Sequence, residues 1–214
     1  EERAASGHGE KYNFGFSNKV ISTNDLLKKI TKNTNSKIDE DAYIKARLFD
    51  MLLGDWDRHD DQWRWAAFKN QDKTIYKPIP RDRDQVFSIM ADGPLLNFVT
   101  KSIPALRLMQ SYDEELANAK WFNLEPYPLD MALINEATKK NWVAQVNYIQ
   151  KRLTASIIED AFTHFPDEVN DKTIADIKRK LKGRSKNLQK ISDEYVKYMN
   201  KFSVIQGNDT DALF

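Results

Sequence analysis

The chain has 214 residues, which is enough to bury a sizeable core and predicts one domain, or one large lobe with an appendage. Its 33 Lys and Arg residues nearly cancel its 32 Asp and Glu residues, so no global basic field points to nucleic acid. The absence of cysteine excludes disulfides, thiolate nucleophiles and cysteine-ligated zinc. No apolar run approaches the roughly 18 residues that cross a bilayer. Function must therefore be inferred from local patterns.

Residues 1–38 are predicted to form an N-terminal arm with one short helix. Residues 1–20 hold scattered glycines among polar residues and show no sustained period. Ser22 can cap a helix that continues through Leu26 to Ile30, and the polar loop TKNTNSK follows it. The chain does not begin with methionine. We therefore expect a piece of a longer protein, with this arm as a possible remnant of an upstream lobe.

Residues 39–214 are predicted to form a mainly α-helical lobe with a small β-hairpin. Asp39 is a suitable N-cap for a helix whose apolar residues keep helical spacing as far as Gly54. Trp63–Phe68 and Thr74–Ile79 are rich in strand formers and flank the turn residues KNQDK. These two strands and the residues beside them form the predicted active-site hairpin, residues 62–84.

The C-terminal half is predicted to be helical from about residue 106, with breaks near EPYPLD, FPDEVND and Gly183. Apolar residues keep helical spacing on the last helix, and they are Leu188, Ile191, Tyr195, Tyr198 and Phe202. This pattern is more typical of core packing than of a cofactor site. The basic stretch KRKLKGRSK, residues 178–186, is expected to be a solvated helix face, because no aromatic residues are interleaved with its cations.

The segment GDWDRHDDQWRW, residues 54–65, places four aspartates on a short loop. Like charges a few ångströms apart destabilise each other unless something positive lies between them. In the predicted hairpin, residues whose numbers sum to about 143 lie opposite one another, so Asp61 would face Asp82. The hairpin would then bring this loop alongside RDRD, residues 81–84, and make one acidic cluster from two.

Convergent carboxylates of this kind suit a hard divalent cation, Mg²⁺ or Mn²⁺, better than zinc. If the strand stays extended, Asp82 and Asp84 share one face. An EF-hand is a poorer explanation, because its obligatory glycine position would be Asp60. The structural alternative is a surface salt-bridge network in which arginines simply pair with the aspartates, and these arginines are Arg58, Arg64, Arg81 and Arg83.

The order of helix, DxDRH loop, hairpin and DxD resembles the catalytic half of the protein-kinase-like fold. WDRHDDQ resembles the DRH loops of HipA-type kinases and of atypical secretory-pathway kinases. KPIPRDRDQVFS resembles the iPWDxDxtFG segment of CotH-type spore-coat kinases. These specific motifs cover residues 40–90. The resemblance implies a kinase-like C-lobe whose N-lobe is missing or degenerate, because residues 1–40 hold no convincing Gly-rich phosphate loop or strand lysine.

The resemblance also implies roles for individual residues. Asp57 matches the catalytic-loop aspartate that accepts the proton of a substrate hydroxyl. The resemblance implies Asp82, Asp84 and Gln62 as metal ligands, and Asp61, or its neighbour Asp60, is the fourth candidate as a replacement for Gln62. Gln62 departs from the Asn or Glu that these families place there. Arg58 and His59 are supporting residues, and His59 is expected to orient the loop by hydrogen bonding.

The function implied is that of a phosphotransferase lobe dependent on Mg²⁺ or Mn²⁺, with ATP as the candidate phosphate donor. The isolated fragment is predicted to be inactive, because the missing lobe supplies part of the nucleotide site. The alternative is a catalytically silent module that binds metal or nucleotide, or that joins domains of a bacterial surface protein.

The stretch ARLFDMLLGDWDRHDDQWRW…PIPRDRD also resembles a segment of large bacterial exported proteins that carry a calcineurin-like phosphoesterase domain and an outer-membrane β-barrel. This second resemblance implies a periplasmic or outer-membrane-associated location. The expected partners are the missing N-terminal lobe or neighbouring domains of the parent protein. No nucleic acid is expected as a partner, and contact with a membrane is expected only through the parent protein.

Overall fold

The structure is a computed structural model, and it describes residues 17, 19–89, 110–134, 136–166, 168 and 171–201. The described part is mainly helical, as predicted, and the predicted hairpin belongs to a small four-stranded mixed sheet. The strands are β1 (Lys19–Ser22), β2 (Ser36–Ile38), β3 (Trp63–Asn70) and β4 (Lys73–Pro80). The helices are α1 (Thr23–Lys32), α2 (Glu40–Leu53), the 3₁₀ helix η1 (Asp60–Gln62), α4 (Ala119–Phe122), α5 (Tyr127–Ile134), α6 (Lys139–Arg152), α7 (Ala155–Phe162) and α8 (Asp171–Met199).

Capping residues fix where the first two helices begin and where α2 ends. The side chains of Ser22 and Asp39 each accept a hydrogen bond from a backbone N–H in the first turn. Gly54 ends α2 with φ 80°, in the left-handed region. A Cβ at this position would lie 2.7 Å from the ring of Tyr112, so glycine is required here by space as well as by conformation.

The hairpin has the register that the turn residues predict. Trp63 lies opposite Pro80 and Asn70 lies opposite Lys73, so the turn falls at residues 71–72. Gln71 adopts φ 54°, a conformation that tight hairpin turns require. The ladder sets the acidic loop before β3 and the RDRD segment after β4 at the same end of the ribbon.

Two tryptophans fasten the hairpin to α2. Trp63 and Trp65 are fully buried, as their size predicts. Their ring centroids lie 4.9 Å and 5.5 Å from that of Tyr43, which is on α2. The hairpin therefore packs against the central helix and does not form an exposed aromatic surface.

Two short strands complete the sheet where none was predicted. Lys19–Ser22 was expected to belong to an irregular arm, but it forms β1 and pairs antiparallel with β3. Ser36–Ile38 was expected to lie in or beside a polar loop, but it forms β2 and pairs parallel with β4. A run of three or four residues is too short for its periodicity to predict a strand. These two runs become strands because they pair with the open edges of the hairpin. The rest of the arm, residues 1–16, lies outside the described residues.

Helix α8 continues through Gly183, so the break predicted there was wrong. A Cβ at Gly183 would lie 2.5 Å from the carboxylate of Glu114, and glycine therefore allows the loop before α4 to approach the helix closely. The next residue, Arg184, is buried and donates to three backbone carbonyls of α2 and of this loop. Close packing outweighs the helix cost of about 1 kcal/mol for one glycine.

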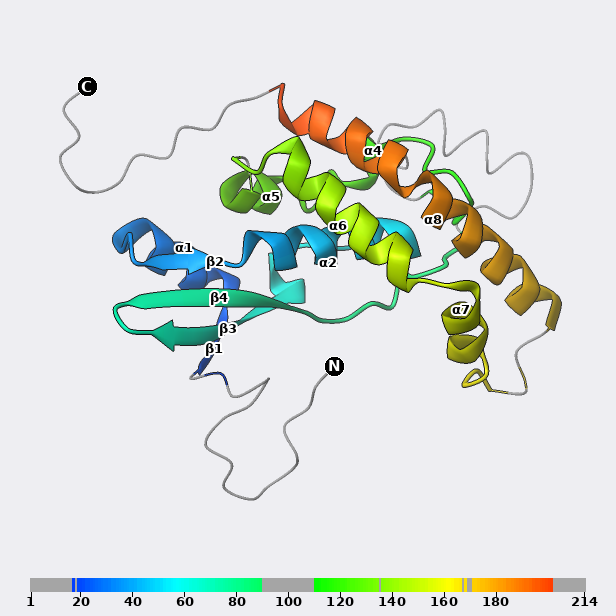
Figure 1. The fold of residues 1–214 in the computed structure, drawn as a ribbon, viewed down its shortest axis with the longest axis horizontal. Coiled ribbons are helices and arrows are strands. Elements are labelled where there is room, and N and C mark those ends of the chain that lie inside the picture. Colours follow the sequence, from blue (N-terminus) through cyan, green and yellow to red (C-terminus); the bar gives the residue numbers. More distant parts are fainter. Residues whose placement is uncertain are drawn as a thin grey trace, which may run out of the picture.

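Helix α2 is the centre of the molecule, with the sheet on one side and helices α6 and α8 on the other (Figure 1). Leu188, Ile191 and Tyr195 of α8 are buried, as their spacing predicts, whereas Phe202 lies outside the described residues. No helix in the described ranges combines the length and the apolar character needed to span a membrane. The C-terminal end of α2 thus connects the core to the acidic loop that follows Gly54.

Candidate functional site

Arg58 joins the acidic loop to the segment that follows the hairpin. Its side chain is fully buried, although the sequence suggested a surface ion pair. Its Nη1 donates to the carbonyl oxygens of Arg81 at 2.5 Å and of Asp82 at 3.1 Å. The backbone N–H of Arg81 donates to the carbonyl oxygen of Gln62 at 2.8 Å. The loop and the RDRD segment therefore lie side by side beyond the last pair of the β ladder.

Asp50, near the end of α2, holds three guanidinium groups. Its Oδ2 accepts from Arg47 Nη1 at 2.9 Å and lies 3.3 Å from Arg58 Nε. Its Oδ1 accepts from Nε and Nη2 of Arg83 at 3.1 Å and 2.9 Å. Asp50 is fully buried. One carboxylate on the central helix thus fixes an arginine from each of the two acidic segments.

Arg47 extends this network to a second buried carboxylate, Asp130 of α5. Arg47 Nε donates to both oxygens of Asp130 at 3.1 Å. The hydroxyls of Tyr43 and Tyr195 donate to Asp130 at 2.8 Å and 2.6 Å. Burial, together with the charge of Asp130, holds the pKa of both tyrosines well above the usual range. Both hydroxyls therefore remain protonated donors at neutral pH.

Asp55 is also buried, although it belongs to the loop that the sequence suggested was exposed. Its Oδ2 lies 3.5 Å from Arg58 Nη1, and neither of its carboxylate oxygens accepts a hydrogen bond among the described residues. Burial, reinforced by the charge of Asp50 and opposed by that of Arg58, raises the pKa of Asp55 to about 7. We call the six buried or half-buried groups the buried ionic cluster; they are Arg47, Asp50, Asp55, Arg58, Arg83 and Asp130.

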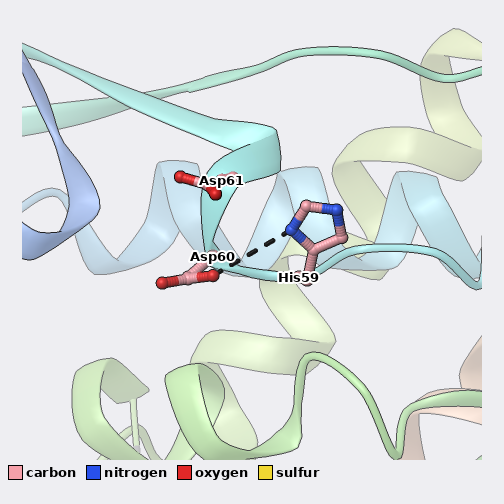
Figure 2. A group of neighbouring side chains, drawn as sticks. All are labelled: His59, Asp60 and Asp61. Carbon is pink, nitrogen blue, oxygen red and sulfur yellow. Dashed lines mark ion pairs between the residues drawn. The ribbon is translucent and has the colours of Figure 1, made fainter.

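The exposed side of the loop carries a different group of side chains, His59, Asp60 and Asp61 (Figure 2). One ligand atom from each of the three lies within 4.8 Å of the others. His59 Nδ1 lies 4.0 Å from Asp60 Oδ1. Exposed carboxylates also gather where no cation binds, so this trio alone does not assign a metal site.

The four predicted metal ligands do not all lie in this trio. Asp61 belongs to it. Gln62 is buried beside it, and its Nε2 lies 3.4 Å from His59 Nε2. Asp82 and Asp84 are exposed and lie outside the trio. Strand β4 ends two residues before Asp82, which has φ 48°, so the extended backbone that would place Asp82 and Asp84 on one face does not continue.

Asp57, the predicted base, is half-buried on the loop between Asp55 and Arg58. Within the described ranges, the carboxylates of Asp57, Asp82 and Asp84 make no hydrogen bond or ion pair. Hard oxygen ligands without a counter-charge are the donors that Mg²⁺ and Mn²⁺ prefer. The donor chemistry of this surface therefore fits such a cation.

Three buried residues that hold the site in place were not predicted from the sequence: Arg47, Asp50 and Asp130. A signal for the first two was present, because they share the buried face of α2 with Ile44 and Leu48. A charge on an apolar helix face requires a partner of opposite charge. Asp130 lies among apolar neighbours in YPLDMALI, which is a similar but weaker signal.

The basic stretch of α8 is engaged in local ion pairs. Lys178 and Lys182 lie 2.6 Å and 2.9 Å from the carboxylate of Glu159. Arg179 pairs with Glu114 of the facing loop. These contacts fit the predicted solvated face, whereas Arg184 of the same stretch is buried and departs from it.

Comparison with known proteins adds no relative from which a function can be transferred. No family model, curated protein or solved structure matches the chain. Function is therefore inferred from the arrangement of the acidic loop, the RDRD segment and the buried ionic cluster.

Proposed function

We propose that the chain is the catalytic lobe of a divalent-metal-dependent phosphotransferase of kinase-like type. The observation that supports this proposal is the contact of buried Arg58 with the carbonyl oxygens of Arg81 and Asp82. It sets the loop with Asp57 beside the segment with Asp82 and Asp84. Kinase-type catalysis needs one loop that carries a base and a neighbouring segment that binds metal.

Asp57 is the candidate base in this proposal, because its half-buried carboxylate is not neutralised within the described residues. It accepts the proton of a substrate hydroxyl while the hydroxyl oxygen bonds to the γ-phosphorus and the bond from that phosphorus to the leaving oxygen breaks. Asp82 and Asp84, with Asp61, are the residues that would hold the cation. A bound Mg²⁺ or Mn²⁺ supplies charge neutralisation at the phosphoryl oxygens.

Rigid support beneath the site also favours the proposal. Positioning contributes much of the rate in phosphoryl transfer, so the groups must be held in place before substrate binds. Asp82 adopts a left-handed conformation, φ 48°, which aspartate visits more readily than most residues with a side chain. The hydrogen bond from Arg58 to its carbonyl oxygen holds the backbone in this conformation. Residues other than glycine in this region of φ are enriched at functional sites.

Gln62 favours a second candidate, a metal-binding or domain-joining module without turnover. The kinase families that the sequence resembles place Asn or Glu at this position. Gln62 is buried, and its amide nitrogen lies beside His59. A neutral amide engaged in this way is a weaker cation ligand than a carboxylate.

Radiolabelled phosphate transfer and calorimetric titration of Mg²⁺-ATP test the proposal, in the chain and in a longer form that carries its upstream residues. Asp57→Asn should leave the affinity for Mg²⁺-ATP nearly unchanged and lower turnover by roughly 100-fold or more. Asp82→Asn should weaken the dependence on metal. Asp72→Asn, on the exposed hairpin turn, is the matched control and should change neither quantity.

The chain by itself should hold Mg²⁺-ATP weakly and transfer little phosphate, because the phosphate-covering parts of a kinase lie in the other lobe. Full activity of Asp57→Asn in the longer form would remove the catalytic assignment. Metal binding that depends on Asp82, with no transfer in the longer form, would favour the silent module.

A further inference from the structure

A groove adjoins the buried ionic cluster and runs between α2, the end of β4 and helices α6 and α7. Its volume is about 540 Å³, which is within the range of small-molecule sites. The lining is mainly apolar and includes Ala46 and Phe49 of α2, Pro78 and Pro80 of β4, and Ile157 of α7. Ile157 is 51% exposed, so one wall of the groove presents apolar surface to solvent.

Three cations border the groove, and no carboxylate of the described residues lines it. Arg83 is already paired with Asp50 at 2.9 Å. Lys45 Nζ and Arg152 Cζ lie 4.6 Å and 3.9 Å from the ring centroid of Tyr148. Within the described ranges neither Lys45 nor Arg152 has an ion-pair partner. The groove therefore combines an apolar surface with two cations that lack a counter-charge.

We propose that this groove binds an anionic amphiphile, a free acyl chain that ends in a carboxylate. The acyl chain covers the apolar lining and removes it from water. The carboxylate pairs with Lys45 and Arg152, in charge-assisted contacts that a neutral head group cannot make. This charge complementarity selects an anion over a cation or a neutral alcohol.

An extended peptide is a poorer occupant, because its backbone N–H and C=O groups need hydrogen-bond partners when they are buried. Pro78 and Pro80 have no N–H to offer. Most of the other lining residues lie on helices, whose backbone groups are bonded internally. An acyl chain carries no such groups and needs none from the groove.

Titration with decanoate, below the concentration at which it forms micelles, tests the proposal. The ¹³C methyl signals of Ile149 and Ile157, which line the groove, report binding at this place. Decyltrimethylammonium has the same chain with the opposite charge, and butyrate has the same head group on a short chain. Decanoate should shift these signals saturably, with the other two binding at least about tenfold more weakly. Equal binding of the ammonium compound, or no saturable binding of decanoate, would overturn the proposal.

Charge reversal then separates this site from general attraction to a cationic surface. The double variant Lys45→Glu with Arg152→Glu should weaken decanoate binding by about tenfold or more. Lys151→Glu is the matched control, because Lys151 is an exposed neighbour that does not line the groove, and affinity should change less than about twofold. Ile157→Ser, at an exposed position of the wall, should weaken binding without unfolding the chain.

Two results would contradict the assignment at this stage. Unchanged decanoate affinity in the double variant would show that the cations do not bind the head group. Tighter binding of an acidic peptide than of decanoate, at the same methyl groups, would assign the groove to a protein partner instead.

Discussion

The buried ionic cluster and the exposed carboxylates beside it are built from the same residue types but differ in what surrounds them. In the cluster, each carboxylate has at least one guanidinium within 3.5 Å. Beside it, half-buried Asp57 and exposed Asp82 and Asp84 have no such partner among the described residues. The acidic loop thus contributes to both groups, with Asp55 and Arg58 in the cluster and Asp57 among the unpaired carboxylates.

Desolvation explains the difference. A carboxylate taken out of water loses several kcal/mol of hydration, and it stays ionised only if a cation and hydrogen bonds compensate it. An exposed carboxylate keeps its hydration and is screened by salt, so it can remain unpaired at little cost. Charges available for a ligand are therefore found at the surface, while the buried charges fix the backbone that positions them.

The largest expected effect on stability follows from removing the charge of Asp50. Asp50→Asn leaves Arg47, Arg58 and Arg83 without their shared counter-charge and should lower the free energy of unfolding by about 3 to 5 kcal/mol. Urea unfolding measures this change, with Asp72→Asn as the exposed control. A loss below about 1 kcal/mol would show that the cluster does not stabilise the fold in the way described.

A smaller effect is expected from Arg58→Lys, which keeps the charge. A lysine ammonium cannot reproduce a planar guanidinium that contacts two carboxylates and the carbonyl oxygens of Arg81 and Asp82. We expect a loss of about 2 kcal/mol in unfolding free energy. Amide hydrogen exchange at Arg81, whose N–H bonds to Gln62, should accelerate more than exchange in α8. Equal acceleration in both regions would indicate global destabilisation only.

The raised pKa of Asp55, about 7, predicts a pH dependence of stability. Because this value lies above the ordinary value of 3.8, the folded state binds the proton more tightly than the unfolded chain. The contribution of Asp55 to stability is therefore present below about pH 4 and is lost as pH rises to about 7. Asp55→Asn should remove this loss and raise the unfolding free energy at pH 8 by about 2 kcal/mol.

Guanidinium unfolding at pH 4 and pH 8 checks the sign of this effect. The variant and the parent should differ little at pH 4 and most at pH 8. A variant that is less stable than the parent at pH 8 would mean that the ion pair with Arg58 outweighs desolvation.

Much of the fold could be predicted from the sequence where one local rule acts alone. Helices α1 and α2 begin where the side chains of Ser22 and Asp39 cap them. Helix α2 ends at Gly54, which has no side chain and adopts a left-handed conformation. The turn residues between the two strands set the register of the hairpin, and the size of Trp63 and Trp65 predicts their burial.

The remainder depends on contacts between distant segments, which a single sequence does not display. Strands β1 and β2 exist because the hairpin offers them an edge. Gly183 reflects the approach of the loop that holds Glu114, not the end of a helix. The burial of Arg58 and Asp55 depends on Asp50, which lies on another element. Spacing placed these charges near one another but did not indicate which of them lose contact with water.

The smallest expected effect on stability comes from changing one of the exposed carboxylates beside the buried ionic cluster. Asp61→Asn changes one exposed carboxylate beside His59 and Asp60 and should alter the unfolding free energy by less than about 0.5 kcal/mol. If Asp61 holds a cation together with Asp82, the same change should weaken Mn²⁺ binding by about fivefold, because one charged oxygen ligand is lost. Water-proton relaxation in a Mn²⁺ titration measures this affinity, and Asp72→Asn is the control for the loss of one surface charge. Equal weakening of Mn²⁺ binding in both variants would show that the loss of any surface charge has this effect. Asp61 would then not be a ligand of the proposed metal site.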